Sequence, residues 1–94
     1  MVSAVVLLSL KRDKINEVAG RLADLEGVTE VYSVAGQYDL VVMVRAADND
    51  SLADLVTGHL LKEEDIIRSE TLISFRVYSR YDLERMFSIG MDEG

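Results

Sequence analysis

The chain contains no cysteine, proline or tryptophan, and only 6 glycines, among its 94 residues. The absence of cysteine excludes disulfides, thiolate metal sites and cysteine nucleophiles. The absence of proline and the small number of glycines argue against linkers and low-complexity segments. Because 49% of the residues are hydrophobic, a chain of this length is expected to form one small globular domain.

Basic residues are also scarce. Ten lysines and arginines stand against 17 aspartates and glutamates, which gives a formal net charge of −7. Nucleic-acid affinity depends on clustered basic side chains that neutralise phosphates. We therefore do not expect this chain alone to bind DNA or RNA.

The apolar start of the chain, residues 1–10, is too short to cross a bilayer, which takes about 20 residues. It has no basic segment before it, and the polar segment 11–14 follows at once. This pattern is typical of a core strand and not of a signal peptide. The sequence therefore predicts a cytoplasmic protein that does not contact the membrane.

The predicted elements follow from two periodicities, two residues for strands and 3.6 for helices. The first helix is expected to be capped by Asp13 and to stop at Gly27; the second is expected to be capped by Ser51 and to end in KEED, residues 62–65. Strands are predicted over residues 2–10, 28–34, 38–46 and 66–79. This order, with right-handed crossovers, predicts an α+β fold: a ferredoxin-like βαββαβ sandwich with a four-stranded antiparallel sheet and two helices on one face.

Two helices can cover only one face of such a sheet, yet the predicted strands are apolar on both faces. An antiparallel sheet with one solvated face would alternate apolar and polar residues. Here the second face also carries apolar residues: Val5, Leu7, Val41, Met43 and Leu72. We therefore expect a second copy of the chain to cover this face, in an isologous dimer formed through the sheet.

Residues that carry chemistry in enzymes are sparse. His59 is the only histidine and falls beside the apolar stripe of the second helix, so it is interpreted as a structural or interface residue. No serine has the setting of a nucleophile elbow, and no glycine-rich phosphate loop is present. The acids Glu63, Glu64 and Asp65 are interpreted as a solvated helix end, and neither a metal nor a cofactor is predicted. We expect a non-enzymatic protein without catalytic residues.

The segment AGQYDL, residues 35–40, places a tyrosine and an aspartate at the mouth of a turn. The backbone N–H groups of the turn suit a carboxylate, and the Asp39 side chain suits an ammonium group. Two hydroxyls lie on one face of the last strand, because their residues are two positions apart. Together these groups suit an α-amino acid, and in an oligomer the turn and the last strand can converge across an interface. The candidate effector-binding residues are Gly36, Gln37, Tyr38, Asp39, Ser69 and Thr71.

This segment resembles the signature hairpin of the leucine-responsive/asparagine-operon regulator family, Lrp/AsnC. The effector-binding domain of that family has the pattern V-x-G-x-Y/F-D-hydrophobic, which falls here on Val34, Gly36, Tyr38, Asp39 and Leu40. Residues 66–79 are similar to the last strand of that domain, which usually carries two threonines separated by one residue. The matching positions are Ser69, a departure that keeps the hydroxyl, and Thr71. The resemblance covers residues 2–79.

The resemblance implies a RAM domain (regulation of amino-acid metabolism), with an ACT/RAM-like fold, over residues 1–80. Such domains dimerise through their sheets, assemble into rings that are often octamers, and bind amino acids in clefts between dimers. The chain starts at the first strand of this domain, without the helix-turn-helix module of the family, and has KEEDI where a Pro-Gly turn is usual. The implied function is a non-enzymatic, oligomeric amino-acid-sensing module that binds an effector or co-assembles with full-length Lrp/AsnC regulators.

Two other functions stay open. The first is a dimeric α+β-barrel enzyme similar to small monooxygenases and haem-degrading enzymes, which would need His59 to face a cavity. The second is a purely structural heteromer partner with an occluded pocket. The C-terminal tail, residues 81–94, either folds back on its own domain or packs on a neighbouring subunit.

Overall fold

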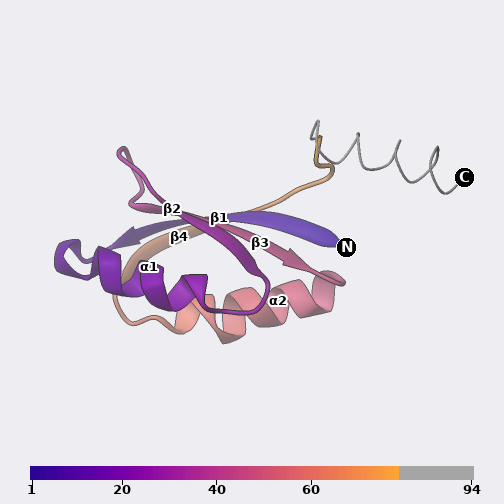
Figure 1. Cartoon of the computed structure of the whole chain (residues 1–94), viewed down its shortest axis with the longest axis horizontal. Coiled ribbons are helices and arrows are strands. Elements are labelled where there is room, and N and C mark those ends of the chain that lie inside the picture. Colours follow the sequence, from indigo (N-terminus) through magenta and orange to yellow (C-terminus); the bar gives the residue numbers. More distant parts are fainter. Residues whose placement is uncertain (79–94) are drawn as a thin grey trace, which may run out of the picture.

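A computed structural model describes residues 1–78 of the chain. Its strands form one antiparallel sheet of order β2-β3-β1-β4, and both helices lie on one face of this sheet (Figure 1). The elements are β1 (Val2–Leu10), the 3₁₀ turn η1 (Arg12–Lys14), α1 (Ile15–Ala23), β2 (Val28–Ser33), β3 (Leu40–Ala46), α2 (Asn49–Gly58), the 3₁₀ turn η2 (Leu60–Lys62) and β4 (Ile66–Ile73). The predicted ferredoxin-like α+β fold, with four antiparallel strands and two helices, is confirmed. The predictions for residues 79–94 lie outside the described residues.

The hydrophobic core lies between the sheet and the two helices. Its positions keep the predicted periods, every second residue on the strands and every third or fourth residue on the helices. They are Ala4, Val6, Leu8, Leu10, Val18, Leu22, Leu40, Val42, Val44, Leu52, Leu55, Val56 and Leu60. Full burial of one leucine side chain contributes about 1.5–3 kcal/mol, so this layer is the main source of stability.

The starts of both helices differ from the prediction. α1 begins at Ile15 without a side-chain cap, and Asp13 lies inside η1. The N-cap of α2 is Asp48 and not Ser51: the Asp48 Oδ1 accepts a hydrogen bond from the Ser51 backbone N–H at 2.8 Å. Ser51 is thus the third helical residue, whose N–H has no partner within the helix and needs such a cap. This hydrogen bond lowers the pKa of Asp48.

The end of α1 also differs from the prediction, since the helix ends at Ala23 and Gly27 lies beyond it, directly before β2. Gly27 has a φ of 97°, which residues with a Cβ rarely adopt. A Cβ at this position would lie 2.8 Å from Cδ2 of Leu55 and 3.1 Å from the carbonyl oxygen of Arg45. Glycine therefore allows the chain to enter the sheet in close contact with α2.

β4 is shorter than predicted, because it ends at Ile73. The Ser74 backbone N–H still donates to the Ser3 carbonyl at 2.9 Å, but the Ser74 hydroxyl donates to the Arg76 carbonyl at 2.9 Å. The second bond closes a local turn. The residues that follow leave the sheet and rise on the side away from the helices (Figure 1).

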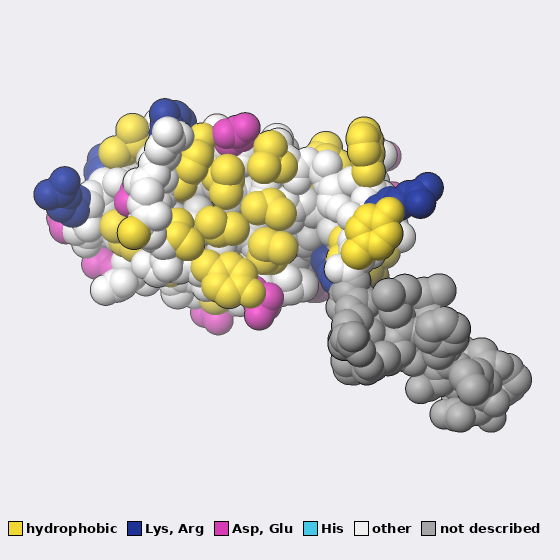
Figure 2. Space-filling model, turned by 90° about the horizontal axis from the view of Figure 1, so that it is seen from above, with side chains coloured by type: hydrophobic (Ala, Val, Ile, Leu, Met, Phe, Trp, Pro, Cys, Tyr) yellow, Lys and Arg dark blue, Asp and Glu magenta, His cyan; other side chains and the backbone are white. Residues whose placement is uncertain are grey.

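The second face of the sheet is open to solvent. The register pairs Val5 with Met43 and Leu72, and Leu7 with Val41, so these side chains share the face away from the helices. Seen from this side, apolar side chains form a nearly continuous surface over the strands (Figure 2). The prediction that the sheet is apolar on both faces is therefore confirmed for its central strands.

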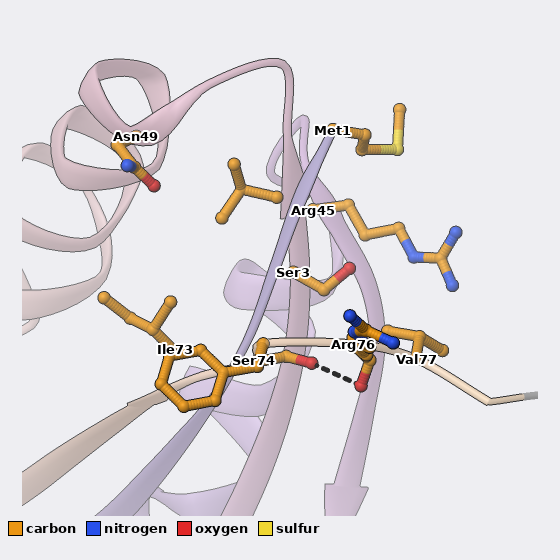
Figure 3. A pocket seen from close by; sticks show the side chains of 10 residues that line it. Met1, Ser3, Arg45, Asn49, Ile73, Ser74, Arg76 and Val77 are labelled. Atoms are coloured by element: carbon orange, nitrogen blue, oxygen red, sulfur yellow. Dashed lines mark hydrogen bonds between the residues drawn. The ribbon is translucent and has the colours of Figure 1, made fainter.

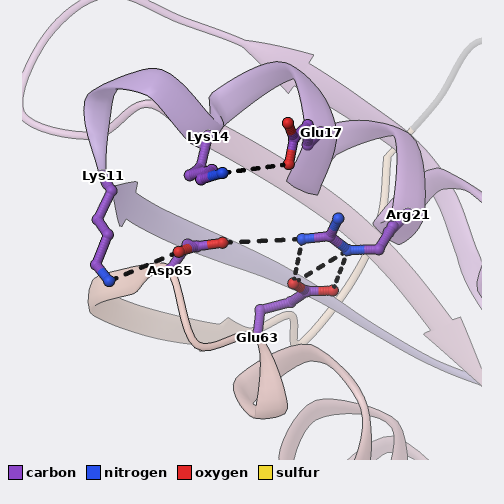
Figure 4. A network of polar contacts seen from close by, with 6 residues as sticks. All are labelled: Lys11, Lys14, Glu17, Arg21, Glu63 and Asp65. Atoms are coloured by element: carbon purple, nitrogen blue, oxygen red, sulfur yellow. Dashed lines mark hydrogen bonds and ion pairs between the residues drawn. The ribbon is translucent and has the colours of Figure 1, made fainter.

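The acids before β4 are not a solvated helix end, as the sequence suggested. The side chains of Glu63 and Asp65 are only 17% and 20% exposed, and both face Arg21 of α1 (Figure 4). Arg21 donates to the two Glu63 oxygens at 2.8 Å and 3.0 Å and lies 3.9 Å from Asp65, which also pairs with Lys11 at 3.7 Å. The hydrogen bonds to Glu63 raise the pKa of Arg21. This network joins α1 to the connection between α2 and β4; only Glu64 is exposed as predicted.

Candidate functional site

Asp39 extends the ladder between β1 and β3 beyond its last backbone pair. The register ends at the pair Leu8 and Leu40. Beyond it, the Asp39 backbone N–H donates to the Leu8 carbonyl at 2.8 Å, and the Asp39 Oδ2 accepts from the Leu10 backbone N–H at 2.8 Å. The Asp39 carboxylate thus takes the place of the β3 backbone carbonyl that would accept from the Leu10 N–H if the pairing of β1 with β3 continued. The acid that the sequence singled out therefore has a structural partner within its own chain.

The turn before Asp39 is fixed to β1 and β4 by polar contacts. The Gln37 carbonyl accepts from the Ser9 hydroxyl and from Nη2 of Arg68, both at 3.2 Å. The Arg68 guanidinium lies over the Tyr38 ring, 4.8 Å from its centroid, and the Tyr38 hydroxyl donates to Oε1 of Glu70 at 2.8 Å. We call Ser9, Gln37, Tyr38, Arg68 and Glu70 the turn cluster.

The turn cluster lies at one end of the open sheet face. Arg68 and Glu70 pair with Ser9 and Leu7 of β1, whose side chains point away from the helices. The connection between β2 and β3 rises on this same side of the sheet (Figure 1). The hydrogen bond to Glu70 raises the pKa of the Tyr38 hydroxyl, while the charge of Arg68 opposes this shift.

The structure does not bring the six predicted site residues into one pocket of a single chain. Ser69 and Thr71 pair with Leu8 and Val6, whose side chains are in the core, so both hydroxyls lie on the helix side of the sheet. The turn lies on the other side. The turn and β4 do meet within one subunit, but through Arg68 and Glu70 and not through the two hydroxyls.

Sequence reasoning missed Arg68, Glu70 and Ser9. A signal for the first two was present, because two opposite charges separated by one residue lie on one face of a strand. Gly36 has a φ of 140° and no atom within 4 Å of where its Cβ would lie. Glycine is thus required at this position by the backbone conformation and not by a close neighbour.

Within residues 1–78, two larger hollows lie at the opposite end of the sheet. The first, of about 540 Å³, includes Arg45 and Arg76 among its lining residues (Figure 3). The second, of about 570 Å³, is lined in part by His59, Asp54 and Glu26. The His59 side chain lies beyond the end of α2, at the rim of this open hollow and not in an enclosed cavity.

Neither a metal cluster nor a membrane span occurs in the described part of the chain. No group of three or more metal-binding side chains is found within residues 1–78. None of the helices there is long and apolar enough to pass through a lipid bilayer.

The sheet and the two helices define a ferredoxin-like α+β domain, with a polar turn beside the open sheet face. The family is shown by comparison: the model of the Lrp/AsnC ligand binding domain matches residues 3–83, and the chain belongs to this family. The resemblance noted in the sequence is thereby confirmed. In transcription regulators this domain is typically non-catalytic.

Similar proteins include solved structures and curated regulators. TTHA0845 from Thermus thermophilus is 42% identical with a TM-score of 0.79, and the match covers 85% of this chain and 100% of that one. The transcriptional regulator FL11 from Pyrococcus furiosus is 35% identical over 77 residues, which are 80% of this chain and 49% of FL11. The feast or famine regulatory protein Rv3291c from M. tuberculosis, solved with L-methionine, is 29% identical with a TM-score of 0.70, and the match covers 85% of this chain and 54% of that one. The chain spans between 39% and 49% of the length of curated regulators such as PF0250 and FL11 from Pyrococcus furiosus.

Proposed function

We propose that the chain is a non-enzymatic, oligomeric amino-acid-sensing module that binds its effector at a subunit interface. The observation that carries this proposal is the turn cluster, which holds a polar, glycine-containing turn in place at the edge of an uncovered apolar sheet face. A binding loop that is already ordered loses little conformational entropy when a ligand arrives. The membership of the chain in the Lrp/AsnC family agrees with this role.

Asp39 and the turn backbone supply complementary groups for an α-amino acid. One carboxylate oxygen, Oδ2, is used by the Leu10 N–H, whereas Oδ1 accepts no hydrogen bond from the described residues and is available to an ammonium group. The N–H groups of Gly36 and Gln37 donate to no backbone acceptor within residues 1–78, so they could bind a carboxylate. Because Ser69 and Thr71 lie on the other side of the sheet, they would act in a site completed by a neighbouring subunit. L-Methionine is a suitable first ligand, since Rv3291c was solved with it.

Pairing through the open sheet face is the first step of the proposed assembly. The apolar side chains of this face would be removed from water by a second copy, which is the main driving force for such association. Larger rings such as octamers, and co-assembly with full-length Lrp/AsnC regulators in the cytoplasm, would follow from further contacts.

Calorimetric titration with each of the twenty amino acids tests the site. Asp39→Asn is the informative variant, because an asparagine oxygen can still accept from the Leu10 N–H while the charge that attracts an ammonium group is lost. An ammonium–carboxylate contact of about 1.5–3 kcal/mol corresponds to a roughly ten- to hundredfold loss of affinity in this variant. Asp24→Asn, an exposed acid at the end of α1, is the matched control and should bind as the wild type does. If no amino acid binds, or if Asp39→Asn binds equally well, the site is wrong.

A purely structural heteromer partner is the second candidate. It is favoured by one observation: the Asp39 carboxylate already has a partner in its own chain, so its presence does not require a ligand. Under this alternative the protein would co-purify with a full-length family member and bind no amino acid. The barrel-enzyme alternative loses support, because it needs His59 in a cavity and the residue lies at an open hollow.

A further inference from the structure

The hollow of about 540 Å³ at the end of the sheet opposite the turn cluster combines two arginines with no acid (Figure 3). Among residues 1–78, its lining includes Arg45 and Arg76 but neither an aspartate nor a glutamate. No ion pair within this part of the chain involves either arginine. In a chain with a net charge of −7, two guanidinium groups that share a hollow create a local positive potential. We call it the arginine hollow.

Backbone hydrogen bonds bring the two arginines to this hollow from distant segments of the chain. Arg45 of β3 pairs with Ser3 of β1, and directly opposite residues of antiparallel strands point to the same side of the sheet. On the other edge of β1, the Ser74 backbone N–H donates to the Ser3 carbonyl, and the Ser74 hydroxyl donates to the Arg76 carbonyl, both at 2.9 Å. The backbone that carries Arg76 is thus fixed beside Ser3, whose side chain lines the same hollow (Figure 3).

Two acids lie close to the arginine hollow, and both already accept hydrogen bonds. Glu30 shares a smaller hollow with Arg45, and its carboxylate accepts from the Tyr32 hydroxyl at 2.7 Å. Asp48 directly precedes the first residue of α2, which lines the arginine hollow, and its carboxylate accepts from the Ser51 N–H at 2.8 Å. In the part of the chain that the structure describes, neither acid forms an ion pair. The two guanidinium groups can therefore bind an anion from solution.

The donors of the arginine hollow suit a phosphate group. A guanidinium presents its N–H groups in a fixed plane and can bind two oxygens of one phosphate. Two guanidinium groups and the Ser3 hydroxyl can together serve the three terminal oxygens of a phosphate ester, whereas a carboxylate offers only two oxygens. The lining also includes the apolar side chains of Val2, Ile73 and Phe75. Its volume lies in the range of sites for small organic ligands, about 300–1,000 Å³, so the hollow has room for more than a phosphate ion.

We propose that the arginine hollow binds a small phosphate ester, with Arg45 and Arg76 as the ligands of the phosphate group. The Ser3 hydroxyl is the third donor. The exposed side chains of Ile73 and Phe75 contact the rest of the ligand, which favours an ester with an aromatic ring, such as a mononucleotide. This site lies at the other end of the sheet from Asp39 and is separate from the amino-acid site of the proposed function. The protein therefore has a second ligand site of different chemistry.

Calorimetric titration of the full-length protein at low ionic strength tests this site. The probes are inorganic phosphate, ribose 5-phosphate and adenosine 5′-monophosphate (AMP), and AMP should bind most tightly because its ring adds apolar contact. Arg45→Gln and Arg76→Gln each remove a charged hydrogen-bond donor, so each should weaken AMP binding roughly ten- to hundredfold. Arg12→Gln is the matched control, because it removes the same charge from an exposed arginine at the other end of β1. This variant should bind AMP as the wild type does.

An NMR titration of the ¹⁵N-labelled protein with AMP locates the site independently of affinity. The amide signals of Ser3, Arg45 and Ser74 should shift, and those of Gln37 and Asp39 should not. Shifts confined to the turn would place AMP elsewhere and overturn the site.

The other outcomes also decide the proposal. If none of the three probes binds, the arginine hollow is not a phosphate site. If Arg12→Gln weakens AMP binding as much as Arg45→Gln does, the attraction is general and the site is wrong. Equal affinity for AMP and ribose 5-phosphate would overturn the role of the apolar side chains. Asp39→Asn should bind AMP normally, so the amino-acid site and the arginine hollow can fail independently.

Discussion

Replacing Asp39 with alanine should destabilise the fold even without any ligand. The variant removes the acceptor of the Leu10 N–H, which lies at a residue only 4% exposed. A donor left unsatisfied in such a place, together with the loss of a hydrogen bond to a charged group, costs about 1.5–3 kcal/mol. Asp39→Asn keeps an acceptor but loses the charge. Because charge-assisted hydrogen bonds are roughly twice as strong as neutral ones, the asparagine variant should lose about half as much free energy of unfolding as the alanine variant.

Urea unfolding followed by circular dichroism measures both losses. All variants need the same protein concentration, since subunit association adds to the apparent stability. The slope of free energy against urea should stay unchanged, because the same surface is exposed on unfolding. An alanine variant within about 0.5 kcal/mol of wild type, the range of an ordinary surface substitution, would refute the structural role of the carboxylate. So would an asparagine variant as unstable as the alanine variant.

Three further predictions follow from the described contacts. Arg21→Gln leaves the largely covered Glu63 carboxylate without its cation, so the thermal midpoint of unfolding should fall by a few degrees. Scanning calorimetry at low and at high salt should show a smaller fall at high salt, because salt screens the ion pair. The hydrogen bond to Glu70 raises the pKa of Tyr38 above 10.0, so this bond stabilises the fold below pH 10 and is lost as the pH rises through the raised pKa. An NMR titration of the tyrosine rings should show the raised pKa, and Glu70→Gln should bring it down again. Met43→Glu would bury an unpaired charge in any sheet-to-sheet pair, which is unfavourable, so light scattering should find a monomer. Its circular dichroism spectrum should match that of the wild type, because the substitution lies on the open face of the sheet.

The element order and the core could be predicted because they depend on local periodicity. The alternation along residues 2–10 and 40–44 and the helical spacing of Val18 and Leu22 each fix which side of an element is buried. The open apolar face followed from the same alternation. These features need only the residue types along one segment of the chain.

The polar contacts of the site could not be predicted, because they join segments distant in sequence. Nothing local shows that the Asp39 carboxylate would accept from Leu10, or that Tyr38 would reach Glu70. The cap of α2 was missed for a different reason. Asp48 and Ser51 are both good capping residues, and only the extended backbone of Asp48 decides between them.

The requirement of sheet pairing for effector binding is tested most directly by calorimetry on two proteins, wild type and Met43→Glu. Each would be titrated with the amino acid that the wild type binds most tightly, at protein concentrations where light scattering has established the oligomeric state. Wild type should bind, and the monomeric Met43→Glu should not, although Met43 lies on the sheet at a distance from Asp39 along the strand. A monomer that binds the same amino acid with wild-type affinity, or an oligomeric wild type that binds none of the twenty, would contradict an effector site built at the subunit interface.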